Sequence, residues 1–210
     1  MKQTHLSSNN TAVFAAFLVL GLVLHFPNAC LARTVEDYVK AFQDSSPEVR
    51  RNALESKELS KCYSEEADEE SCPFAKEDFK RLTGALIDLL SDPNPEVRKQ
   101  AAMYLNSSTD SRVIRPLARL LTDRDDQVRA VAASAFVHTS VHDEGIVNDL
   151  EKLLRDNNEK VRAGAAMSLV LNGTRKSLDR MREAHDHETE PDVKKLFGET
   201  MRQLEKRTQK

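Results

Sequence analysis

A short motif recurs along this chain at a nearly constant interval. Each copy has an acidic residue, a Val five positions later and an Arg directly after the Val. The clearest copies contain Val97, Val128 and Val161, which are 31 and 33 residues apart, and a degenerate copy with Val193 and Lys194 follows after 32 more. A fixed period of this length is typical of a repeat architecture, in which each unit buries its apolar face against its neighbours.

Each unit is predicted to contain two helices. Before each acid, apolar residues recur at three- and four-residue steps, as in Leu86, Leu89 and Leu90, which indicates a helix buried along one side. The turn then ends in a residue suited to cap the second helix, as at Ser46, Asn94, Asp125 and Asn158. The second helices are expected to bury a Val, an Ala pair and a large apolar residue: Val97, Ala101, Ala102 and Leu105; Val128, Ala132, Ala133 and Phe136; Val161, Ala165, Ala166 and Leu169. The predicted fold is therefore all-α, an α-solenoid of stacked antiparallel helix pairs.

An earlier copy of the motif runs from Asp44 to Arg50. Its Val49 stands 48 residues before Val97, about one and a half periods, so an insertion is expected after it. We divide the solenoid, residues 33–210, into an N-terminal repeat with an acidic, Cys-flanked insertion (33–80), regular repeats (81–204) and a polar tail (205–210).

The motif resembles that of the HEAT repeat superfamily, in particular the short HEAT-like repeats of the phycobilisome-lyase type, over roughly residues 36–204. The resemblance implies a structural ladder in which the acid and the Arg link adjacent repeats. By helical phase the Arg lies within the buried arc, where it needs a carboxylate partner. The ladder positions are Asp44, Arg50, Asp92, Arg98, Asp123, Arg129, Asp156 and Arg162, with Glu188 and Lys194 as a looser pair.

Residues 1–32 have a different character. Lys2 is followed by a run of apolar residues from Ala12 to Phe26, which is shorter than the ~20 residues that a membrane span needs. This pattern predicts a secretory signal peptide that is cleaved after Ala32, and hence an exported protein of the periplasm or cell envelope with no membrane span in its mature form. The alternatives are a lipoprotein acylated at Cys30 and an uncleaved N-terminal anchor.

Removal of that segment leaves two cysteines, Cys62 and Cys72, on either side of an acidic run at residues 65–70. An even number of cysteines in an oxidising compartment predicts one disulfide between them; two separate buried thiols are the alternative. The remaining chain has 30 basic against 34 acidic residues. This balance argues against a nucleic-acid partner.

No catalytic, cofactor or metal site is expected. His138 and His142 are four residues apart, but they are predicted to lie at the end of a helix, and His185 and His187 lie in a polar turn. The resemblance also brings in two enzyme classes, the phycobilin lyases and the diiron deoxyhypusine hydroxylases. Only one of the latter's His-Glu pairs occurs here, at His187-Glu188, so the hydroxylase activity is expected to be absent. A metal-dependent or lyase-type enzyme on a HEAT-like scaffold is the alternative reading.

The expected function is protein or peptide binding, because a solenoid offers a long surface without a preformed pocket. On the second helices, positions three, six and ten after each Val point away from the buried stripe. Several are apolar, and Met suits an adaptable peptide surface. We name these residues, together with His138 on the same arc, the candidate face: Met103, Val131, His138, Met167, Leu171 and Leu196. The partner is not identified by the sequence.

Overall fold

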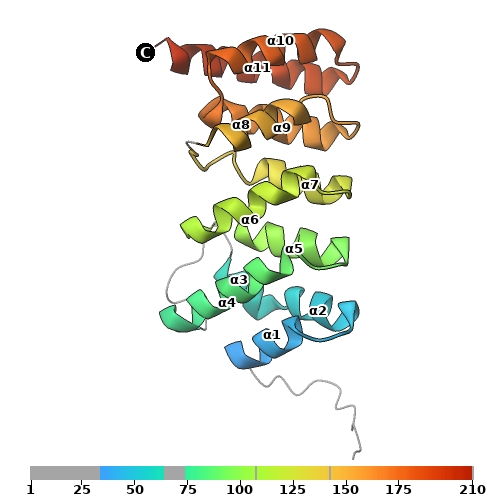
Figure 1. Ribbon diagram of the computed structural model, residues 1–210, viewed down its shortest axis with the longest axis vertical. Coiled ribbons are helices and arrows are strands. Elements are labelled where there is room, and N and C mark those ends of the chain that lie inside the picture. The colour runs from blue at the N-terminus through green and yellow to red at the C-terminus, as the bar shows by residue number, and fades with distance from the viewer. Residues whose placement is uncertain (1–33, 64–73, 107, 142, 210) are drawn as a thin grey trace, which may run out of the picture. The chain divides into compact units, whose positions relative to one another are not determined.

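The computed structural model describes residues 34–63, 74–106, 108–141 and 143–209 (Figure 1). The chain divides into two units, Met1–Ala32 and Arg33–Lys210, and all described residues lie in the second. Within the described residues every regular element is a helix. The α-helices are α1 (Val35–Phe42), α2 (Pro47–Leu54), α3 (Lys57–Cys62), α4 (Lys76–Leu89), α5 (Pro95–Leu105), α6 (Ile114–Arg119), α7 (Asp126–Ser134), α8 (Glu144–Leu153), α9 (Glu159–Asn172), α10 (Arg175–His187) and α11 (Pro191–Thr208).

The helices pair and stack in chain order, so the predicted all-α solenoid is confirmed (Figure 1). The second helices of the pairs, α2, α5, α7, α9 and α11, each contact the next in succession. The first helices are α1, α4, α6, α8 and α10, and α6 is flanked by the short 3-10 helices η1 (Ser111–Val113) and η2 (Leu120–Thr122). Helix α3 is additional to this pattern and precedes residues 64–73, where the sequence places the insertion.

Helix starts follow the expected capping chemistry. The side chains of Asn94, Asp125 and Asn158 accept hydrogen bonds from backbone amides in the first turns of α5, α7 and α9. Pro47 is the first residue of α2, where the missing amide hydrogen of proline removes no helix hydrogen bond. Ser46 precedes it but makes no capping hydrogen bond with its side chain.

The core consists of small and branched apolar side chains. All the residues predicted to be buried on the second helices are buried, including the Ala pairs of α5, α7 and α9. The short side chains let these helices pack closely. Gly164 of α9 has no side chain, and its backbone lies directly against α7. A Cβ atom added at Gly164 would lie 3.0 Å from the Ser134 hydroxyl and 3.2 Å from the Ala133 Cβ of α7.

The structure also corrects several expectations. Helix α7 ends at Ser134, so Phe136 is buried from the following loop rather than from the helix. The residues that follow Phe136 include the β-branched Val137, Thr139 and Val141. Because β-branched side chains have a lower helix propensity than unbranched ones, this segment is less suited to continue the helix. Helix α4 begins before residue 81, and α11 continues to Thr208 through most of the predicted polar tail.

Candidate functional site

The predicted ladder residues form a row of ion pairs at the start of the second helices. Arg129 is representative: its Nε and Nη2 donate to the two carboxylate oxygens of Asp156 in the next repeat, at 2.8 and 3.0 Å. Its Nη1 donates to the carbonyl oxygens of Asp123 and Arg124 in its own turn, at 2.8 and 3.2 Å. The same arrangement links Arg50 to Asp92, Arg98 to Asp123 and Arg162 to Glu188. Each Arg therefore contacts two repeats at once.

The acids of the ladder also shape their own turns. Oδ1 of Asp44, Asp92, Asp123 and Asp156 accepts a hydrogen bond from the amide two residues later, at 2.8 to 2.9 Å. Glu188 replaces the Asp in the last copy and accepts from the Thr189 and Glu190 amides at 3.0 Å. The longer side chain thus reproduces the function of the Asp, and Glu188 is a full member of the row rather than a loose one.

The electrostatics of the row agree with this geometry. Hydrogen bonding from Arg162 holds the pKa of Glu188 below its ordinary value, against the opposing effect of burial. At Asp123, burial acts to raise the pKa, but hydrogen bonds from Arg98 and the Asp125 amide outweigh it and lower the pKa. Between 2% and 17% of each side chain in the four Arg–acid pairs is exposed. Such pairs hold a structure together, and this arrangement leaves them no free group for catalysis.

The candidate face divides into exposed and partly covered members. Met103, Met167 and Leu171 are 54%, 40% and 38% exposed, which is unusual for large apolar side chains. Val131 and Leu196 are only half-exposed, and Val131 packs against the core. His138 is exposed but lies in the loop after α7, not on a helix. The exposed apolar residues thus belong to α5 and α9, on either side of α7.

The loop residues 135–141 that follow α7 are tied to the next repeat by two buried polar residues that the sequence analysis did not single out. Asn172 of α9 accepts from the Val141 amide at 2.7 Å and donates to the Phe136 carbonyl at 2.9 Å. Ser168, one turn earlier, donates to the Ala133 carbonyl. These contacts satisfy backbone groups that the early end of α7 leaves without helix partners. The sequence feature that could have indicated these contacts is the presence of two polar residues, Ser168 and Asn172, four positions apart within a largely apolar helix.

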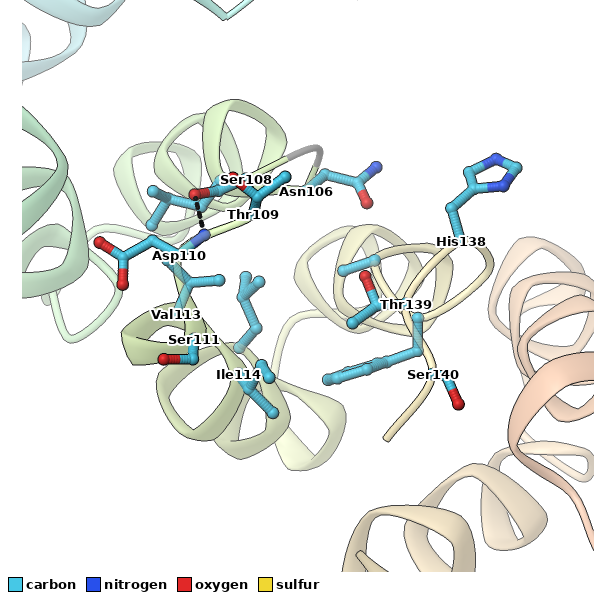
Figure 2. Close-up of a pocket in the computed structure, with 14 residues that line it drawn as sticks. Asn106, Ser108, Thr109, Asp110, Ser111, Val113, Ile114, His138, Thr139 and Ser140 are labelled. Carbon is cyan, nitrogen blue, oxygen red and sulfur yellow. Dashed lines mark hydrogen bonds between the residues drawn. The ribbon is translucent and has the colours of Figure 1, made fainter. Parts of the chain in front are cut away.

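A cavity of about 470 Å³ lies between the loop after α5 and the loop after α7 (Figure 2). Its polar residues come from residues 106–111 and 138–140, which include Ser108, Thr109, Thr139 and Ser140. The sequence analysis did not single out these residues as the lining of one cavity.

The remaining sequence predictions have mixed outcomes. Cys62 is buried at the end of α3, whereas Cys72 and Cys30 lie outside the described residues, so the disulfide stays a prediction. His138 lies in the loop after α7, which ends at Ser134, and His142 lies outside the described residues. Among the described residues there is no group of three His, Cys, Asp or Glu side chains placed to hold a metal ion, and none of the described helices is long and apolar enough to cross a membrane.

Comparison with known proteins supports the repeat assignment. Residues 74–137 match the family model for HEAT repeats. Residues 74–137 therefore contain HEAT-type repeats. The phycobilisome-lyase type stays a prediction. A comparison with curated proteins finds no match.

Several solved structures with a similar fold are engineered or designed repeat proteins. One engineered protein from the Northeast Structural Genomics Consortium has 23% sequence identity and a TM-score of 0.57, with 82% of this chain and 79% of that chain covered. A designed armadillo repeat protein in complex with the peptide (KR)4 has 20% identity and a TM-score of 0.55, with 81% of each chain covered. A computationally designed armadillo repeat protein for modular peptide recognition has 20% identity and a TM-score of 0.54, with 80% of this chain and 81% of that chain covered. At these identities the likeness concerns the fold.

Proposed function

We propose that this protein is an exported, non-catalytic interaction module that binds a peptide segment of a protein partner across its second helices. The observation that carries the proposal is the exposure of Met103, Met167 and Leu171 on α5 and α9. Exposing such side chains to water is unfavourable, whereas covering them with a partner would be favourable, at ~25 cal/mol per Å² of apolar surface. The designed armadillo proteins with a similar fold, two of them made for or complexed with peptides, support a peptide ligand.

The ligand that suits this surface is apolar rather than basic. Positions three, six and ten after the Val on α5, α7 and α9 contain no charged residue, apart from titratable His138. A basic peptide such as (KR)4 would lose hydration there without gaining carboxylate partners. We therefore expect uncharged, apolar peptides to bind and (KR)4 to bind at least tenfold more weakly.

The test is selection from a displayed random-peptide library, followed by fluorescence anisotropy with the selected peptides. The double variant Met103→Glu/Met167→Glu should weaken binding at least tenfold. The matched control Ser60→Glu/Gln209→Glu adds the same two charges at exposed polar positions away from the candidate face and should bind normally. Equal binding by both variants, or no selected peptide at all, would exclude the candidate face as the interaction surface.

The exported location rests on residues 1–32, which lie outside the described residues. Secreted protein should begin at Arg33 when its N-terminus is sequenced, because Ala32 and Cys30 supply the small residues that precede a signal cleavage site. A blocked N-terminus whose mass shows a diacylglyceryl group on Cys30 would support a lipoprotein instead.

The same compartment would allow Cys62 and Cys72 to form a disulfide. A bond across this short, acidic segment would stabilise the protein by ~2–3 kcal/mol, mainly because it restricts the unfolded chain. Thiol counting on the denatured, unreduced secreted protein should detect no free thiol. Two reactive thiols per chain would show that the bond is absent.

A further inference from the structure

The cavity introduced above arises where the repeat pattern is broken twice. Five residues separate α5 from η1, and nine separate α7 from α8, whereas only Gly173 and Thr174 separate α9 from α10. Because α7 is 9 residues long and α9 is 14, the last turn that α9 has is missing from α7. The two irregular connections lie in adjacent repeats, and together they form the walls of one cavity (Figure 2).

The cavity has an apolar floor and a polar rim. The floor is formed by side chains of α5, η1, α6 and the loop after α7: Leu105, Val113, Ile114, Leu117, Ala135 and Phe136. The rim has amide and hydroxyl side chains: Asn106, Ser108, Thr109, Ser111, Thr139 and Ser140. Asn106 and Thr139 extend from the two loops into the space between them (Figure 2). A volume of about 470 Å³ is within the ~300–1,000 Å³ range of small-ligand sites, which combine a mostly apolar lining with a few polar groups.

The charge of the lining restricts the ligand further. Asp110 is the carboxylate of the lining, and its oxygens already accept hydrogen bonds from the Arg112 side chain at 2.6 to 3.1 Å. The Asp110 carboxylate and the His138 ring both point away from the centre of the lining residues (Figure 2). A charged ligand would therefore lose its hydration without meeting an opposite charge. The chemistry favours an uncharged group with an apolar body and a hydrogen-bonding end.

Both walls are held in place before any ligand arrives. The loop after α7 is fixed by Asn172, whose side chain bonds both Phe136 and Val141. The loop after α5 is fixed by the Ser108 hydroxyl, which accepts from the Asp110 amide at 3.2 Å, and by Asp110, which caps η1. Walls ordered in advance reduce the entropy that binding would otherwise lose.

We propose that this cavity is a binding site for a neutral phenol-like group, with its ring over Ile114 and its hydroxyl between Asn106 and Thr139. The group can come from a small molecule or from a tyrosine side chain of a peptide, since both present the same chemistry. The site shares His138 with the candidate face, but that ring points away from the centre of the lining residues (Figure 2). Binding in the cavity therefore does not depend on the exposed Met and Leu side chains of the candidate face.

The experiment is a titration of the full-length chain with 4-methylphenol, followed by isothermal calorimetry and by amide chemical shifts in NMR spectra. Thr139→Phe, which fills the cavity, should weaken binding at least tenfold, and Thr139→Val, which removes only the hydroxyl, about fivefold. Met103→Ala on the candidate face should leave the affinity unchanged. 4-Methylbenzoate, of similar shape but charged, should bind at least tenfold more weakly than 4-methylphenol.

The changes in amide chemical shift are measured on the wild-type chain, so they test the proposal even if a variant does not fold. They should centre on Asn106, Ile114 and Thr139. The absence of saturable binding, shifts centred elsewhere, or equal affinity for 4-methylphenol and 4-methylbenzoate would each overturn the proposal. The capped tripeptide Gly-Tyr-Gly separates the two sources: tighter binding than 4-methylphenol supports a peptide side chain, and weaker binding supports a small molecule.

Discussion

Each ladder Arg uses one guanidinium group for two tasks that a Lys cannot combine. The planar donors of Arg162 bind the two oxygens of Glu188 at 2.6 and 2.8 Å, and its third nitrogen binds two carbonyl oxygens of its own turn. In the last copy, Lys194 has a single ammonium, which reaches the Glu188 carbonyl at 3.4 Å. The replacement of Arg by Lys occurs in the last repeat that the structure describes.

Replacement of Glu188 tests the charge on this row. Because the pKa of Glu188 is lowered in the folded state, its carboxylate adds stability at pH values above its unfolded pKa of ~4.3, and this contribution is lost as pH falls through the lower folded value. Glu188→Gln should therefore cost ~2 kcal/mol at pH 7. The difference from wild type should shrink below about pH 4 in urea denaturation series. A difference that stays constant down to pH 3 would show that hydrogen-bond shape, and not charge, is what matters.

At the scale of elements, the two central second helices, α7 and α9, differ in length and pack closely against each other. Helix α7 stops one turn early, and α9 compensates with Ser168 and Asn172, which bond the backbone of α7 and its loop. Gly164 brings the two helices together, since its missing side chain leaves room for Ser134.

Two glycine substitutions separate helix propensity from this close packing. Gly84 in α4 has no atom within 4 Å of an added Cβ, so Gly84→Ala should stabilise the protein by ~0.5–1 kcal/mol. Gly164→Ala gains the same propensity but forces contacts of 3.0 to 3.3 Å with Ser134 and Ala133, and should destabilise by ~1–2 kcal/mol overall. Thermal denaturation of both variants measures the difference. If both are equally stabilised, α7 and α9 have room to move apart.

At the scale of the whole molecule, the ladder should matter most in the middle of the array. Arg129→Ala would leave Asp156 without its side-chain donor, at a cost of ~3–5 kcal/mol for a largely buried pair. Lys194→Ala removes one long contact in the last repeat and should cost less than ~1 kcal/mol. Chemical denaturation of both variants compares the two positions. Small and equal losses would mean that apolar packing alone holds the repeats together.

Most of the architecture could be predicted from the sequence because it depends on local patterns. The period of the motif, the caps at Asn94 and Asn158 and the buried Ala pairs are all set within a few residues. The end of α7 could not be predicted in this way, because the groups that stabilise it come from Asn172, 31 to 36 residues further along the chain. The cavity was missed for the same reason: two loops that look merely polar in sequence form one site only after the repeats stack.

The orientation of the ladder also bears on how such a chain can change in length. Each ladder Arg reaches forward to the acid of the following repeat, so each unit carries an acceptor for the preceding repeat and a donor for the following one. Duplication of one whole period, for example from Asp123 to the residue before Asp156, would supply both halves of the new junction at once. A chain built in this way can gain or lose units by recombination between its own copies, and its surface can lengthen without the evolution of a new kind of interface.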